Sequence, residues 1–341
     1  MIRDSHMNIS NNQYFYSLDF FRGFCGYGVA ITHLYAFAYE HEYMEYMSLI
    51  FAEFFFILSG FVLYPQLLKV INNKKNLFIF YKRRWMRTLP LYIVVLILIS
   101  ALTNQLLSFD FLKYFFLIQK IIPDFLSNDY YPVVWHLSIE ETFYLIFPLI
   151  VINFNKYNFI NKVIFLFVFI TLVKFFLSYL VDANFYRTGT LLRFDAILLG
   201  FIIAHFKDKL FLYKKIIFIT FLFFSIIYLL NSNFFISKRD LPHLKFLFII
   251  FMQFTSSVVM MAFILTEPFI KNKYVKSFSL LISQQAFSIY LFHMIFIYLL
   301  KKSDLSILYG TSLYLIFLFI ISTIVYKYFE EPIMKLRPKI I

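Results

Sequence analysis

Apolar stretches long enough to cross a membrane follow one another along almost the whole sequence. A helix of about 20 apolar residues spans the hydrocarbon core of a bilayer. Hydrophobic residues make up 61% of the chain, more than a water-soluble domain can bury. We predict an all-α polytopic membrane protein, a bundle of about ten transmembrane helices at residues 18–38, 46–68, 89–107, 134–152, 160–181, 188–206, 211–231, 243–266, 277–300 and 306–328.

The segments between these stretches are short and rich in Asn and Lys, so we expect one domain without long linkers. Residues 1–17 are predicted to form an N-terminal segment, in which residues 1–6 are a remnant before the start at Met7. Residues 18–330 form the transmembrane domain, and residues 331–341 form a C-terminal tail. The first stretch carries internal charges, so we expect no cleaved signal peptide.

The distribution of Lys and Arg predicts the orientation. Of the 32 such residues, 21 lie at the chain ends and in the even-numbered loops, 8 lie in the odd-numbered loops, and 3 lie within predicted helices. Because cytoplasmic loops carry the excess of positive charge, both chain ends are expected to be cytoplasmic. The net charge of +13 is spread over short loops, so nucleic-acid binding is not expected. The single cysteine, Cys25, cannot form an intramolecular disulfide.

The first predicted helix carries three ionisable residues, Asp19, Arg22 and His33. Each would cost roughly two or more kcal/mol against lipid, so they are expected to face protein or water. Arg22 and His33 are eleven residues apart, which places them within about 20° of one helix face and roughly 16 Å apart along the axis. Gly26 and Ala30 lie between them on that face. The face is either one wall of a polar crevice or, if Arg22 reaches the lipid head groups, a close helix-packing surface.

The depth of a residue in the membrane follows from its distance to the outer end of its helix, at a rise of about 1.5 Å per residue. By this measure, six ionisable side chains on six predicted helices fall in one layer of the outer half of the membrane. Ionisable groups at such depth are functional candidates by default. If the helices surround one cavity, these groups meet there. An alternative for Glu140 is a structural ion pair with Lys174 or Arg193. The six residues are His33, Glu53, Glu140, Lys174, Arg193 and His293.

A basic segment precedes the third predicted helix on the expected cytoplasmic side. In it, Lys82, Arg83, Arg84 and Arg87 lie among aromatic residues. One interpretation is attraction to anionic lipid, worth about 1 kcal/mol per residue. The other is a site for a phosphate-bearing cofactor, because guanidinium groups hold phosphate oxygens through paired hydrogen bonds.

Six motifs occur in order along most of the chain. The first is SLDFFRGFCGYGVAITH, with ten residues between Arg22 and His33. The others are FAEFFFILSGFVL at 51–63, YKRRWMRTLP at 81–90, WHLSIEETFYLIFP at 135–148, FSIYLFHMI at 287–295 and YKYFEEPIMK at 326–335. Together they resemble the motifs of membrane acyltransferase family 3, which includes O-acetyltransferases of bacterial surface polysaccharides.

The resemblance implies a multi-pass protein of the inner (cytoplasmic) membrane that transfers an acyl group, usually acetyl from acetyl-CoA, to a hydroxyl of an envelope carbohydrate. Capsule, lipopolysaccharide O-antigen, peptidoglycan, exopolysaccharide and small secondary metabolites all remain open as acceptors. No metal ion is expected. The resemblance also implies that His33 and Arg22 are essential and that Arg84, Arg87, Trp135 and Glu140 support them.

Two departures from the family pattern bear on the acceptor. His136 stands where many members have a small polar residue, which would alter the acceptor mouth. The sequence also has no appended extracytoplasmic hydrolase-like domain, so the acceptor is expected to meet the membrane core directly.

We hypothesise a reaction that spans the membrane. The thioester arm of the donor would follow the Gly26 and Ala30 face toward His33. His33 would act as general base on the acceptor hydroxyl or as a transient acyl carrier, and the sequence does not choose between the two. The residues expected to hold the CoA phosphates are Arg22, Arg83, Arg84 and Arg87.

Other residues have supporting roles in this hypothesis. Glu140 is expected to orient His33 or to stabilise its imidazolium. Arg193 or Trp135 is expected to stabilise the oxyanion, although a Trp at a helix start is often an interface anchor. His293 is either a second wall of the cavity or a hydrogen-bonded core residue. The further candidates for the acceptor or oxyanion site are Asp19 and Tyr144.

A transporter of a glycan or lipid-linked sugar is the alternative function, with His33, Glu140 and Lys174 as a proton relay. The sequence shows no evident inverted repeat or pair of broken helices, which argues against it. A non-catalytic scaffold would not require charges inside the bilayer. Binding of acetyl-CoA would separate an enzyme from a transporter.

Overall fold

In the computed structural model, every regular element among the described residues is a helix. The described residues are 14–154, 158–231, 233–234, 236, 241–303 and 305–339. Most of the expected N-terminal segment lies outside them, residues 1–6 included, as do Arg3, Lys156, Lys238 and Arg239 from the charge count. The prediction of an all-α fold is confirmed.

Within the described part of the chain, one long helix coincides with each of the ten predicted stretches. They are α1 (Tyr16–His33), α2 (Glu42–Asn72), α3 (Asn76–Leu102), α5 (Trp135–Val151), α6 (Phe159–Leu177), α8 (Phe194–Phe206), α9 (Lys214–Leu230), α11 (Pro242–Thr266), α12 (Lys273–Leu300) and α13 (Ile307–Val325). Shorter helices are α4 (Phe109–Phe115), α7 (Ala183–Thr188) and α14 (Glu331–Lys335).

The third long helix begins earlier than the sequence predicts. The prediction starts it at residue 89, but α3 begins at Asn76 and includes the whole basic segment. Residues 77–81 are apolar, and the Lys and Arg residues that follow have high helix propensity, so nothing breaks the helix there. The arginines therefore project from a helix at fixed spacing rather than from a loop.

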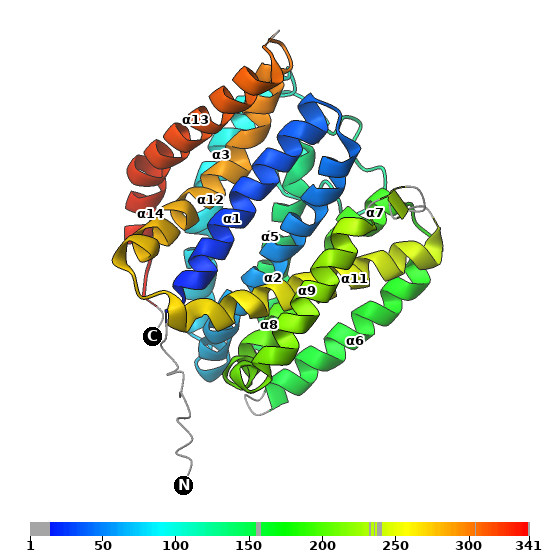
Figure 1. The fold of residues 1–341 in the computed structure, drawn as a ribbon, viewed down its shortest axis with the longest axis vertical. Coiled ribbons are helices and arrows are strands. Elements are labelled where there is room, and N and C mark those ends of the chain that lie inside the picture. Colours follow the sequence, from blue (N-terminus) through cyan, green and yellow to red (C-terminus); the bar gives the residue numbers. More distant parts are fainter. Residues whose placement is uncertain are drawn as a thin grey trace.

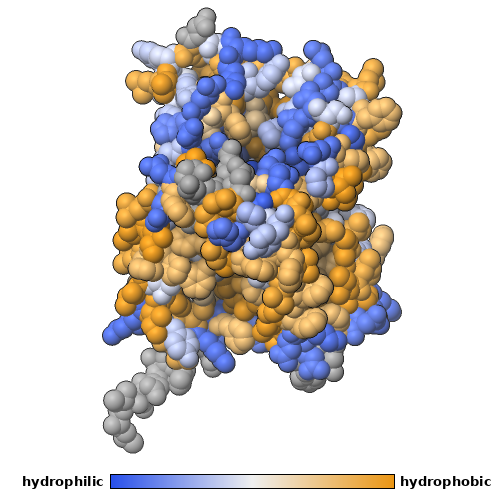
Figure 2. Space-filling model, turned by 90° about the vertical axis from the view of Figure 1, so that its right-hand side faces the viewer, coloured by the Kyte–Doolittle hydropathy of each residue, from blue (hydrophilic) through white to orange (hydrophobic). Residues whose placement is uncertain are grey.

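Eight helical runs of the described residues are long and apolar enough to cross a membrane. The run Thr190–Leu230 contains two predicted stretches, those of α8 and α9. α1 is not among the eight, because Asp19, Arg22 and His33 lower its hydropathy, and it lies inside the bundle against α2, α11 and α12 (Figure 1). On the surface, an apolar belt lies between more polar ends (Figure 2).

The small residues of α1 serve its packing against α12. A Cβ on Gly26 would stand 3.2 Å from the Cα of Ala286, and Ala30 is fully buried. The Ala30 carbonyl oxygen accepts a hydrogen bond of 2.9 Å from the Tyr314 hydroxyl. Small residues let two helices approach closely, so the face between Arg22 and His33 is a packing surface and does not line a crevice.

α2 and α8 touch backbone to backbone at two glycines. A Cβ on Gly60 would stand 1.9 Å from the carbonyl oxygen of Ile197, and a Cβ on Gly200 would stand 2.1 Å from that of Ile57. Only glycine fits at both positions. This contact gives the LSGF segment a structural role and fixes α2 relative to α8.

Two ion pairs lie buried between α2, α6 and α8. Lys174 Nζ is 2.6 Å from Asp195 Oδ2, and both side chains are fully buried. Arg193, just before α8, pairs with Glu53 of α2. The structural pairing considered for Glu140 is therefore not formed, since Lys174 and Arg193 have other partners. Breaking one member of a buried pair costs about 3–5 kcal/mol, so these pairs bind the three helices together.

We expect Gly60→Ala to lower the free energy of unfolding by about 3 kcal/mol, the upper end of typical overpacking costs, because the added methyl meets backbone that no rotamer change can move. Thermal unfolding of the detergent-solubilised protein, followed by size-exclusion chromatography, measures the loss. Gly310→Ala is the matched control, since its closest neighbour, the Tyr39 hydroxyl at 2.6 Å, can swing away. Equal unfolding midpoints for Gly60→Ala and the unaltered protein would contradict the backbone contact.

Candidate active site

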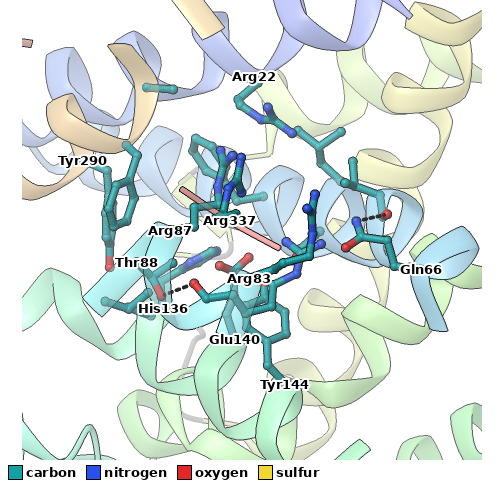
Figure 3. A pocket seen from close by; sticks show the side chains of 18 residues that line it. Arg22, Gln66, Arg83, Arg87, Thr88, His136, Glu140, Tyr144, Tyr290 and Arg337 are labelled. Atoms are coloured by element: carbon teal, nitrogen blue, oxygen red, sulfur yellow. Dashed lines mark hydrogen bonds between the residues drawn. The ribbon is translucent and has the colours of Figure 1, made fainter. Parts of the chain in front are cut away.

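A cavity of about 240 Å³ lies between α1, α2, α3, α5 and α12, and Arg337, which follows α14, also lines it. Five arginines line it, and Glu140 is the carboxylate among its lining residues (Figure 3). We call it the arginine cavity. Positive charge is therefore in excess here, in a partly buried site where an anion would be stabilised. The five are Arg22, Arg83, Arg84, Arg87 and Arg337.

Neighbouring groups hold the α3 arginines in place. The Arg84 guanidinium carbon stands 5.4 Å from the centre of the Tyr144 ring. Arg83 donates a hydrogen bond of 2.6 Å to the Pro338 carbonyl oxygen. The Nε atoms of Arg83 and Arg84 are buried and have no hydrogen-bond partner among the described residues. An unsatisfied buried donor costs about 1–3 kcal/mol, so the cavity fits a ligand with several acceptor oxygens, such as a phosphate.

Asp19 and Ser283 position Arg22 at the edge of this cavity. Arg22 Nη1 lies 3.9 Å from Asp19 Oδ1 and 3.4 Å from Ser283 Oγ. Ser283 donates to Asp19 at 2.7 Å, and the Tyr14 hydroxyl also donates to Asp19. The sequence placed Asp19 among the acceptor-site candidates, whereas in the structure it lies at the opposite end of α1 from His33.

Arg337 belongs to the same cluster, and sequence analysis missed it. It follows α14, beyond the last membrane-spanning run, and lines the arginine cavity. Burial and the positive charges of Arg87, Arg83 and Arg84 lower its pKa to about 10. These positive charges repel one another, and an anion between them would offset the repulsion. Arg337 lies in the C-terminal tail, after the last of the six motifs, so the sequence did not indicate that it belongs to the site.

Glu140 lies in the arginine cavity, beside the hydroxyls of Ser59 and Tyr144, and no contact with His33 is found among the described residues. The depth estimate assumed that α5 begins at the membrane surface. The segment before α5 is instead buried in the bundle, with Val134 fully buried and Val133 nearly so. Because α5 starts deep, its sixth residue, Glu140, lines the arginine cavity and not the cavity beside His33.

The single polar chamber expected from the depth estimate is not formed. Glu53, Arg193 and Lys174 belong to the two buried ion pairs, and Arg193 lines neither of the cavities described here. Glu140 and Tyr144 lie in the arginine cavity. Within the predicted layer, His33 meets His293 and Glu53 meets Arg193, but the six residues do not share one cavity among the described residues.

A second cavity, of about 30 Å³, lies beside His33. Apart from His33, its larger polar or aromatic lining residues are Phe55, Trp135, His136, Arg187 and Tyr290. We call it the histidine cavity. It brings together the end of α1, the start of α5 and the short helix α7.

Hydrogen bonds fix the tautomer of His33. His293 Nδ1 lies 2.7 Å from the Tyr290 carbonyl oxygen, and His33 Nδ1 lies 3.0 Å from His293 Nε2. A carbonyl oxygen only accepts, so His293 carries its proton on Nδ1 and accepts at Nε2. His33 then donates from Nδ1 and keeps a lone pair on Nε2. The hydrogen-bonded partner of His33 in the structure is therefore His293, and the sequence held this residue only as a cavity wall or core histidine.

The two cavities share a wall. Phe55, His136 and Tyr290 line both of them. His136 is fixed, because its Nε2 donates to the Ala52 carbonyl oxygen at 3.0 Å and its ring stacks 3.9 Å from that of Phe56. The residue that departs from the family pattern thus stands between the arginine cavity and the histidine cavity.

These residues lie within a region that matches known proteins. Residues 15–327 match the family described as Acyltransferase domain. A protein of Haemophilus influenzae named "Uncharacterized protein" is 33% identical over 220 residues, which cover 53% of this chain and 88% of that protein. No solved structure matches the chain. Since the family match covers most of the chain, with both cavities' principal residues inside it, the chain belongs to the acyltransferase 3 family.

Proposed function

We propose that this protein moves an acetyl group from cytoplasmic acetyl-CoA to a hydroxyl of a cell-envelope carbohydrate, across the inner membrane. The observation that carries the proposal is the shared wall of the arginine cavity and the histidine cavity. An acyl donor in the arginine cavity would be separated from His33, in the histidine cavity, by one layer of side chains. The excess of Lys and Arg near the chain ends supports a cytoplasmic location for the arginine cavity.

In this proposal the arginine cavity binds the phosphates of acetyl-CoA. Arg22, Arg83, Arg84 and Arg87 offer guanidinium groups at one site, and such groups recognise phosphate through paired hydrogen bonds. Arg337 joins them. The donor arm would reach His33 past Phe55, His136 and Tyr290 rather than along α1, because Gly26 and Ala30 are covered by α12 and α13.

His33 is the proposed general base. The lone pair on its Nε2 takes the proton of the acceptor hydroxyl while the hydroxyl oxygen attacks the thioester carbonyl. His293 is a positioning residue, because its Nε2 holds the other proton of His33 on Nδ1. Glu140 is also a positioning residue, and its proposed role moves from His33 to Arg84 and Arg87, whose charges act on it.

We expect acetyl-CoA to raise the thermal unfolding midpoint of the purified protein, because a ligand at 100 times its Kd adds about 2.7 kcal/mol to the free energy of unfolding. Arg87→Ala should weaken this binding by about 10- to 100-fold, the cost of one or two charge-assisted hydrogen bonds. Lys335→Ala is the matched control, because Lys335, the last residue of α14, is also basic and is 72% exposed. The same stabilisation by acetyl-CoA in both variants would reject the arginine cavity as the donor site.

His33→Gln should lower the rate of acetyl-CoA-dependent thiol release by about 10²- to 10⁴-fold, because no base remains at the acceptor hydroxyl. Stabilisation by acetyl-CoA should stay unchanged, since His33 lies outside the arginine cavity. His41→Gln, at an exposed histidine before α2, serves as control. Retained activity in His33→Gln would reject His33 as the general base. Mass spectrometry of envelope glycans from His33→Gln cells would identify the acceptor as the glycan that lacks O-acetyl groups.

His293→Ala should lower kcat by about 10- to 100-fold with an unchanged KM for acetyl-CoA, because His33 loses the partner that fixes its tautomer. His293→Gln should recover much of the rate, since an amide oxygen can accept from His33 while the amide nitrogen donates to Tyr290. Equal loss in both variants, at unchanged unfolding midpoints, would contradict the positioning role.

A further inference from the structure

The proposed transfer passes through a charge that the residues named so far do not stabilise. When the acceptor oxygen bonds to the thioester carbonyl carbon, the carbonyl electron pair moves onto its oxygen and forms an oxyanion. Hydrogen-bond donors aimed at this oxygen usually give the largest single contribution to catalysis. The sequence assigned the role to Arg193 or Trp135. Arg193 pairs with Glu53 and lies outside the histidine cavity, whereas Trp135 lines this cavity and offers one neutral N–H donor.

Most donors around the histidine cavity are already used. The Ser48 hydroxyl donates to the Glu45 carbonyl oxygen at 2.6 Å, and the Tyr290 hydroxyl donates to that of Val133 at 2.8 Å. His136 donates to a backbone oxygen of α2. Backbone N–H groups inside helices are used in the helices themselves. An oxyanion in this cavity therefore depends on side-chain donors of the remaining lining residues.

Arg187 is the one permanent cation among the residues that line the histidine cavity in the described part of the chain. Its guanidinium carbon lies 5.4 Å from the centre of the Trp135 ring, another lining residue. It is close enough for its charge to act on the His33 ring. A guanidinium has five N–H donors, so it can keep a protein partner and still donate to an oxyanion.

The buried ion pair between α2 and Arg193 holds Arg187 in place. Arg193 Nη1 donates to the Arg187 carbonyl oxygen at 3.2 Å, while its Nη2 binds Glu53. Asp182 caps the start of α7 by accepting from two backbone N–H groups. Both ends of this short helix are therefore fixed, and the Trp135 ring supports the plane of the guanidinium.

We propose that Arg187 is a catalytic residue that stabilises the oxyanion of the acyl transfer, an assignment that rests on the proposed function. His33 takes the acceptor proton as the C–O bond forms and the oxyanion develops against Arg187. When the oxyanion collapses, the C–S bond breaks, and the proton from His33 goes to the leaving thiolate. The products are an ester and a thiol, and no other reactant is needed.

The test measures kcat and the KM for acetyl-CoA in membrane vesicles from the native cells, which carry the natural acceptor. Arg187→Met should lower kcat by about 10²- to 10³-fold while the KM for acetyl-CoA changes less than about threefold. Arg187→Lys should fall between Arg187→Met and the unaltered protein, because a cation without the planar fork remains. Guanidinium ion should restore part of the rate of Arg187→Ala and none of the rate of His33→Gln.

Lys302→Met is the matched control, because Lys302 also lies over an aromatic ring, 4.4 Å from the centre of Tyr298, and is exposed. Unchanged kcat in Arg187→Met would overturn the proposal, and so would a raised KM with unchanged kcat. If Arg187→Met fails to fold, the rate of Arg187→Lys and the effect of guanidinium decide. An active His33→Gln would overturn the proposed function itself, whereas an inactive His33→Gln with an active Arg187→Met overturns only the role of Arg187.

Discussion

An ionised group inside a low-dielectric bundle must have a partner, because an unpaired buried charge costs several kcal/mol. Two pairs, Lys174 with Asp195 and Arg193 with Glu53, meet this need within the protein and join three helices. The arginine cavity does not, since its arginines outnumber the Glu140 carboxylate. The same rule that makes the first charges structural supports the proposal that the second set binds an anionic ligand.

The position of helix ends decides where the chemistry can occur. α5 begins inside the bundle, so Trp135 lies in the histidine cavity and Glu140, farther along the same helix, lies in the arginine cavity. His33 is the last residue of α1, and α7 brings Arg187 to the same place. The end of α1, the start of α5 and the short helix α7 thus surround the proposed reaction site.

Much of the fold was predictable, because each membrane-crossing helix must be a continuous apolar stretch. The grouping of Arg22 with the arginines of α3 at one site was also predictable, from residue type and motif. The partner of His33 did not. Depth along a helix places a residue in a layer, but it does not give the rotation or tilt that brings His293 to His33 and takes Glu140 away from it.

The sequence by itself determined the all-helical membrane architecture and the family, since hydropathy and ordered motifs are local properties of the chain. Only the tertiary structure decided which ionisable residues are neighbours. Arg193 was assigned to chemistry and proved to be half of an ion pair, whereas Arg187 and Arg337 lie in the two cavities without any distinguishing pattern around them. The reason is physical: the contact between two buried groups depends on how helices far apart in sequence cross, which no single stretch encodes.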